Sequence, residues 1–188
     1  MGHDPKYADR INSFALVGYI DDQLGDFLNR LRQELKPGCL AAAHVTVLPP
    51  RSLSVDTDTG ERELSAGLER FSPFPVEITG VHIFSVTDVI YLEIGLGRAQ
   101  LTELHQTLNT KQFAFHEPHE YHPHVTLAQG VELADIPALY EQAKRRWKEE
   151  SPTHRFMLER LTFVQNTVDN VWVDLAEFDL RKPVLVPR

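Results

Sequence analysis

The tripeptide His-Val-Thr occurs twice in the chain, at residues 44–46 and 124–126, and an apolar residue follows each copy. In a β-strand, residues i and i+2 project from the same face. His44 and Thr46 would therefore project together, as would His124 and Thr126. An imidazole with an ordinary pKa of about 6.5 can accept or donate a proton near neutral pH. Threonine hydroxyls can donate hydrogen bonds to oxygens on which charge develops.

Two such pairs facing one cleft would suit the cleavage of a phosphodiester. A neutral imidazole can take a proton from water, while a protonated one gives a proton to the departing sugar oxygen. The hydroxyls can bind the non-bridging phosphate oxygens, and no metal or other cofactor is needed in this scheme. A single His-x-Thr carries little information, but two copies at matching places in a repeat are a much stronger indication.

The surrounding pattern predicts the elements that position these pairs. Helices are predicted after Asp21 or Asp22, around Leu64–Phe71, around Leu101–Leu108 and after Asp135. Strands are predicted at 13–20, at 42–50 where two prolines would end the strand, at about 75–85 and 88–96, and at 122–129. A final hairpin is predicted at 156–165 and 170–180, with Asp169-Asn170 in its turn.

The order helix, His-Val-Thr strand, helix, hairpin thus occurs twice, with an offset of about 80 residues. Tyr91-Leu92-Glu93 and Trp172-Val173-Asp174 fall at nearly the same offset. We therefore expect residues 1–188 to form a single bilobal domain of two similar lobes that are related by a pseudo-twofold axis. No linker or low-complexity segment separates the halves.

Composition limits the possible partners. With 188 residues, 42% of them hydrophobic, the chain suits one compact core. The formal charge of −8 argues against non-specific binding of nucleic acid, although one local site remains compatible with it. Cys39 is the one cysteine, no apolar run is long enough for a membrane span, and the N-terminus does not read as a signal peptide. We expect a soluble cytoplasmic monomer without a membrane partner.

The paired motifs, with Leu-Pro-Pro after the first and Tyr-His-Pro before the second, resemble the two-histidine (2H) phosphoesterase superfamily. Within it, the chain is similar to the 2′-5′ RNA ligase or RNA 2′,3′-cyclic phosphodiesterase family over about residues 13–181. The resemblance implies an α+β bilobal fold with antiparallel sheets lining a central cleft and helices outside. It implies cofactor-free hydrolysis of 2′,3′-cyclic phosphates or 2′-5′ linkages in RNA 3′ ends or small cyclic nucleotides. An ATP-independent ligation would be the reverse reaction.

One position departs from the pattern of this family. Close relatives often carry Arg or Lys three residues after the second threonine, where this chain has Gln129. Arg51, seven residues after His44, is a candidate replacement for the missing cation. Tyr121, or His122 beside it, is a candidate for the rim of the cleft, in contact with a base or ribose.

Other patterns leave alternatives open. The run His116–His124 could hold a metal ion, although it lacks a helical HExxH motif, so that a metallo-hydrolase remains a third hypothesis. A binding module that holds a nucleotide or RNA end without turnover is a second hypothesis. Phe14, Tyr19 or Phe84 could stack on a base, and the basic helix segment 144–148 could follow RNA, although a core or solvated role is more common for each.

Overall fold

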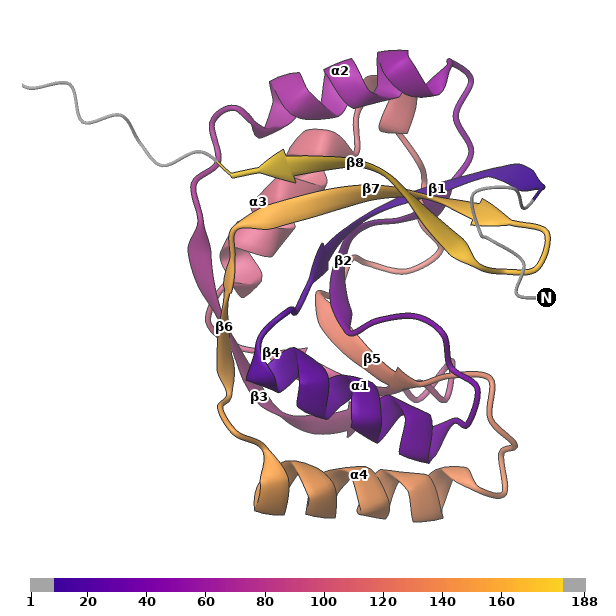
Figure 1. The fold of residues 1–188 in the computed structure, drawn as a ribbon, viewed down its shortest axis with the longest axis vertical. Helices are drawn as coiled ribbons and strands as arrows, with labels where there is room; N and C mark the ends of the chain where they lie inside the picture. The colour runs from indigo at the N-terminus through magenta and orange to yellow at the C-terminus, as the bar shows by residue number, and fades with distance from the viewer. Residues whose placement is uncertain (1–8, 181–188) are drawn as a thin grey trace, which may run out of the picture.

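The computed structural model describes residues 9–180, which form two antiparallel four-stranded sheets with four α-helices around them (Figure 1). The first sheet has the order β2-β1-β7-β8 and the second the order β5-β4-β3-β6. The strands are β1 (Arg10–Tyr19), β2 (His44–Arg51), β3 (Phe74–Ile83), β4 (Ile90–Ile94), β5 (His124–Ala128), β6 (Arg155–Leu158), β7 (Arg160–Thr167) and β8 (Trp172–Asp179). The expected α+β fold is therefore confirmed.

The helices are α1 (Gln23–Leu35), α2 (Thr57–Leu68), α3 (Arg98–Leu108) and α4 (Ile136–Glu150). Helices α1, α3 and α4 lie close to the predicted segments, whereas α2 begins and ends earlier than the segment predicted around Leu64–Phe71, because Asp56 caps its start. The carboxylate of Asp22 accepts hydrogen bonds from the first amides of α1, as expected for an N-cap, whereas the side chain of Asp135 makes no such bond at the start of α4. Within the described residues, no helix is both long enough and apolar enough to cross a membrane.

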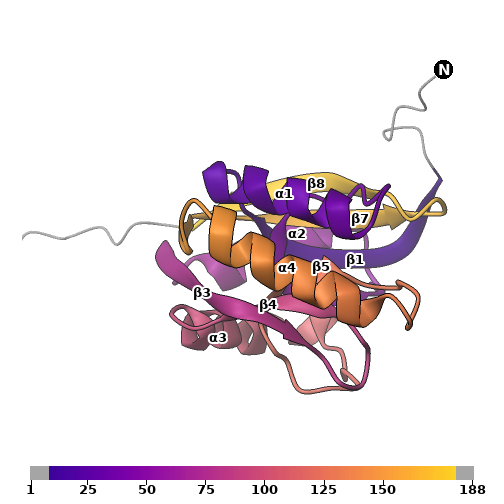
Figure 2. The same cartoon turned by 90° about the horizontal axis from the view of Figure 1, so that it is seen from below.

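Two helices, α1 and α3, pack against the sheet that does not contain the strand preceding them, whereas α2 and α4 pack on the sheet of their preceding strand. Thus α1, which follows β1, packs on β5, while α3, which follows β4, packs on β2. Helices α1 and α4 lie together below the second sheet, and α2 and α3 lie together on the other side (Figures 1 and 2). The apolar faces of all four helices pack around one continuous core.

The two sheets have equivalent strand orders. In each, the strand that begins with His-Val-Thr, β2 or β5, lies at an edge, and β1 or β4 lies next to it. Position therefore makes β4 the counterpart of β1, although the sequence offset aligns β4 with β8. The edge strands β2 and β5 also contact each other, so the two edges meet in the middle of the molecule.

Two predicted strands have different bounds in the structure. Strand β2 continues through Pro49 and Pro50 to Arg51, because an edge strand tolerates residues that lack an N–H. The segment predicted as one strand at 156–165 divides near Glu159 into β6, which pairs with β3, and β7, which pairs with β1. The β7–β8 hairpin is present as predicted, and Asn170 adopts the positive φ of its turn.

Candidate active site

The two histidine pairs occupy matching places on their sheets. In the first sheet, His44 lies opposite Tyr19 and Thr46 opposite Val17. In the second, His124 lies opposite Glu93 and Thr126 opposite Tyr91. Directly opposed residues project from the same face. Both the histidine and threonine side chains are partly exposed, whereas Val45 and Val125 between them are fully buried.

We call these two sheet surfaces, which carry His44 with Thr46 and His124 with Thr126, the histidine faces. On the first sheet, this face also carries Ala15, Val17 and Val164, which form a small apolar cluster separate from the main core. The main core therefore lies behind the strands, and the predicted alternation of buried valine and projecting polar residues is confirmed.

Both imidazoles are held by the same local hydrogen bond. Nδ1 of His44 lies 2.7 Å from the carbonyl oxygen of Ala42, and Nδ1 of His124 lies 2.7 Å from that of His122. A carbonyl oxygen can only accept, so in each ring Nδ1 carries the proton and donates it. In the neutral ring, Nε2 is therefore left with a free lone pair. This bond fixes both the tautomer and the orientation needed for proton transfer.

The surroundings disfavour a positive charge on either ring. Burial is the largest cause that lowers the pKa of His44, to about 4, and the charges of Arg32 and His124 act in the same direction. Burial also lowers the pKa of His124, as does the charge of His122. The two rings thus interact electrostatically, and both are neutral near pH 7 in the free protein. An anion bound beside them would favour the protonated form instead.

This low pKa of His44 predicts a pH dependence of stability. Below about pH 6.5 the unfolded chain gains a proton at His44 that the folded chain does not, so stability is lost as the pH falls towards 4. Because the ring is partly exposed, we expect a loss of about 2 kcal/mol. Urea unfolding of the wild type and His44→Gln at several pH values measures it, since the variant lacks this contribution. Parallel pH curves for the two proteins would contradict the assignment.

Buried and partly buried polar side chains donate hydrogen bonds to carbonyl oxygens of the two histidine strands. The hydroxyl of Tyr121 donates to the carbonyl oxygen of Thr46 at 2.8 Å, and the guanidinium of Arg32 donates to that of Thr126. Nδ1 of His105 donates to the carbonyl oxygen of Val47 at 2.8 Å, and its ring stacks on Tyr121 at 4.0 Å. Tyr121 thus links the segment before the second motif to the first motif.

Aromatic and charged groups gather around His124. The ring of Phe84 meets that of His124 edge-on at 5.0 Å and stacks on Tyr91 at 3.8 Å. Nε2 of His122 lies 2.8 Å from a carboxylate oxygen of Glu93, which also forms an ion pair with Arg98. The sequence indicated Phe84 as a candidate stacking residue, but the Glu93–Arg98 pair had no recognisable signal in it.

The candidate substrate-binding residues are not all at the histidine faces. Arg51 is buried, and its guanidinium is used by carbonyl oxygens of Pro49 and Phe113, by the Asn109 amide oxygen and by the Glu117 carboxylate. This places Arg51 among protein acceptors rather than at a phosphate site, which corrects its suggested role. Its bonds fasten the end of β2 to the segment after α3.

Gln129 has an exposed side chain just after β5. Nζ of Lys36, at the end of α1, lies 2.5 Å from the carbonyl oxygen of Gln129 and 3.2 Å from that of Gly130. A cation does therefore lie beside Gln129, but it comes from the end of α1, which packs on β5, and it contacts the backbone carbonyl oxygens.

The other candidate features are divided between core and surface. Phe14 is buried and stacks on Phe163, whereas Tyr19 lies edge-on to His44 at 6.3 Å. In the basic helix segment, Arg146 pairs with Glu34 and Glu150, and Lys144 pairs with Glu141, as expected for a solvated face. Among residues 9–180, no group of three or more His, Cys, Asp or Glu side chains is arranged to hold a metal ion.

Comparison with known proteins agrees with this geometry. The family described as the 2′-5′ RNA ligase superfamily matches residues 20–170, which is well over half of the chain and includes both motifs. The chain belongs to the 2′-5′ RNA ligase superfamily. Membership in this superfamily confirms the resemblance inferred from the two His-Val-Thr motifs.

Relatives of this 2′-5′ RNA ligase superfamily member cover most of its length. A putative phosphoesterase of Halalkalibacterium halodurans is 26% identical over 179 residues, covering 90% of this chain and 98% of the relative. A putative phosphoesterase of Oceanobacillus iheyensis is 29% identical over 128 residues, covering 63% and 71%. Crystal structures of E. coli LigT with 3′-AMP and with phosphate cover 93% of the chain and 99% and 100% of LigT, with TM-scores of 0.60 and 0.59 at 16% identity. They show that this superfamily member shares the LigT fold.

Proposed function

We propose that the chain is a phosphoesterase that opens a 2′,3′-cyclic phosphate or a 2′-5′ phosphodiester of an RNA end or nucleotide without a metal ion. The observation that carries this proposal is the equivalent orientation of two imidazoles. Each donates its Nδ1 proton to a carbonyl two residues earlier and presents Nε2 beside a threonine on the same strand face. The names of the relatives and the nucleotide and phosphate complexes of LigT support the same chemistry.

The proposed reaction uses the two rings in opposite protonation states. One neutral Nε2 takes a proton from water as the water oxygen forms its bond to phosphorus. The bond from phosphorus to the 2′ or 3′ oxygen breaks, and the protonated ring gives its proton to that oxygen. With a 5′-hydroxyl in the place of water, the same steps would form a bond from phosphorus to the 5′ oxygen and break the bond to the 3′ oxygen, giving a 2′-5′ linkage without ATP, and their reversal would cleave that linkage. Either histidine can therefore act as acid or base, according to the direction of the reaction.

Two features of the site favour reaction of a bound phosphate. The first is the negative charge of the phosphate, which raises the pKa of both imidazoles. It thereby offsets the lowering of the pKa by burial and allows one ring to hold the required proton. The hydroxyls of Thr46 and Thr126 project on the same faces as the histidines and make no hydrogen bond to another described residue. They are therefore available to donate to the non-bridging oxygens.

Thr46→Val and Thr126→Val are expected to lower kcat for 2′,3′-cyclic AMP by about 10- to 100-fold each, since each removes a donor to charge that develops in the transition state. Valine keeps the branched shape of threonine, so the strands should remain intact. Steady-state kinetics with 2′,3′-cyclic AMP measures the effect, and Thr79→Val on the exposed part of β3 is a matched control. A change in KM with unaltered kcat in both variants would show that the hydroxyls bind the ground state only.

A panel of 2′,3′-cyclic mononucleotides, cyclic-ended oligoribonucleotides and 2′-5′ oligoadenylate tests the proposed function as a whole. We expect cleavage of at least one of these substrates by the wild type. Tight binding across the panel without any cleavage would instead support a nucleotide-binding module.

A further inference from the structure

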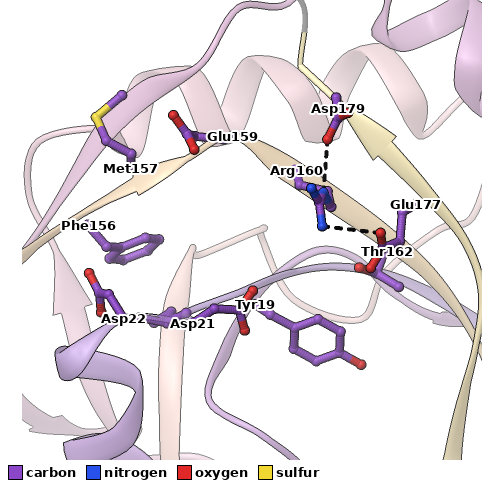
Figure 3. A pocket seen from close by; sticks show the side chains of 11 residues that line it. Tyr19, Asp21, Asp22, Phe156, Met157, Glu159, Arg160, Thr162, Glu177 and Asp179 are labelled. Carbon is purple, nitrogen blue, oxygen red and sulfur yellow. Dashed lines mark hydrogen bonds and ion pairs between the residues drawn. The ribbon is translucent and has the colours of Figure 1, made fainter.

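A pocket of about 470 Å³ opens on the histidine face of the first sheet (Figure 3). It is bounded by β1, the start of α1, β6, β7 and β8. Most of its polar lining is acidic, and we call it the carboxylate pocket. Its charged residues are Asp21, Asp22, Glu159, Arg160, Glu177 and Asp179.

The carboxylate pocket is continuous with the surface around His44. Tyr19 lines the pocket and lies directly opposite His44, with the two rings edge-on at 6.3 Å. Thr162, which also lines the pocket, lies opposite Val17, and Val17 lies opposite Thr46. Two strand spacings, about 10 Å, therefore separate the Thr46 strand from the strand of Thr162. A nucleoside attached to a phosphate at His44 is long enough to reach the pocket.

The charges in the pocket are strongly unbalanced. Five carboxylates face one guanidinium, and that guanidinium is held by two of them, since Arg160 lies 3.2 Å from Glu177 and 2.9 Å from Asp179. Figure 3 shows both interactions. Asp21 and Glu159 have no side-chain hydrogen bond or ion pair within residues 9–180. Free carboxylates attract hydrogen-bond donors and repel another anion.

A second, independent observation concerns Thr162. This residue is only 2% exposed and lines the pocket, yet its hydroxyl forms no hydrogen bond with any other residue in the described range. Among the described residues, the buried polar side-chain atom without a partner is Nε of Arg32, so the unpaired Thr162 hydroxyl is not sealed in the core but open to the pocket that this residue lines. A bound molecule with hydroxyl or amino groups would supply that partner.

We propose that the carboxylate pocket binds the phosphate-free, hydrogen-donating part of the substrate, such as ribose hydroxyls and base amino groups, and that it rejects a second phosphate. This inference rests on the proposed function. It assigns the chain to small cyclic nucleotides with a single phosphate rather than to RNA ends, in which every further nucleotide adds an anionic phosphate.

The test compares 2′,3′-cyclic AMP with the same nucleotide bearing an additional 5′-phosphate. For the wild type, kcat/KM should be at least about tenfold higher without the 5′-phosphate, because several carboxylates face the added charge. Asp21→Asn combined with Glu159→Gln should lower this preference several-fold, since it removes two charges while keeping the side-chain shapes. Glu69→Gln combined with Glu149→Gln makes the same charge change on exposed positions outside the pocket and should leave the preference unchanged.

The outcomes separate this inference from the proposed function. Equal turnover of both nucleotides by the wild type, or an equal effect of the pocket and control variants, would overturn the inference and leave the phosphoesterase proposal intact. If neither nucleotide is cleaved, calorimetric binding of 3′-AMP and of adenosine 3′,5′-bisphosphate still tests the inference about the carboxylate pocket. Weaker binding of the bisphosphate that the pocket variant relieves would support the inference, and equal affinities would overturn it.

Discussion

Replacing either His44 or His124 with alanine is expected to lower the turnover of 2′,3′-cyclic AMP by at least about 100-fold. Each substitution removes the one imidazole that can move a proton on its side of the phosphate. Because the two rings act as a unit, the double variant should be little worse than either single variant. Steady-state kinetics on folded protein, checked by circular dichroism, measures these losses.

His116→Ala is the matched control, because His116 lies in the exposed loop before the second motif. Its activity should equal that of the wild type, and EDTA should change the activity of neither protein. Full activity in His44→Ala or His124→Ala would remove the acid–base assignment. Loss of activity in the His116 variant together with sensitivity to EDTA would instead support the metallo-hydrolase hypothesis.

Arg51→Met is expected to destabilise the fold by about 3 kcal/mol while leaving kcat/KM of the folded enzyme within about twofold of wild type. The Arg51 side chain is 1% exposed and lies 2.8 Å from Glu117. Its removal leaves a largely buried carboxylate and three other acceptors without their donor. Urea unfolding and initial-rate kinetics below the unfolding transition measure the two effects separately.

A substitution of Glu117, the ion-pair partner of Arg51, tests this prediction further. In Arg51→Met combined with Glu117→Gln, the unpaired charge is gone, so the double variant should lose less stability than the sum of the single variants. A stable Arg51→Met protein whose KM for the cyclic nucleotide rises more than tenfold would contradict the structural role of Arg51. Such a result would support a phosphate-binding role for Arg51.

The sequence predicted the parts of the site that depend on local periodicity. Alternation along a strand determines that His44 projects with Thr46, and that His124 projects with Thr126, while the valines are buried. Recurrence of the motif within a repeated order of elements indicated that the pairs occupy matching strands. The structure has them on matching edge strands of two equivalent sheets.

Features that depend on contacts between distant segments could not be predicted in this way. Arg51 is close to the first motif in sequence, but the end of α3 and the segment after it bring Asn109, Phe113 and Glu117 as acceptors to its guanidinium. The division of one apolar segment into β6 and β7 follows from pairing with strands of two different sheets. The carboxylate pocket similarly joins Asp21 to Glu159 and Asp179, which no local pattern connects.

The most direct test of the convergence of the two imidazoles is a crystal structure with uridine and vanadate, which together mimic the five-coordinate transition state of phosphodiester cleavage. We predict one vanadium between the two motifs, with Nε2 of His44 and Nε2 of His124 each about 3 Å from opposite apical oxygens. Vanadate contacted by only one of these rings, or fully occupied at another place, would contradict the two-histidine mechanism.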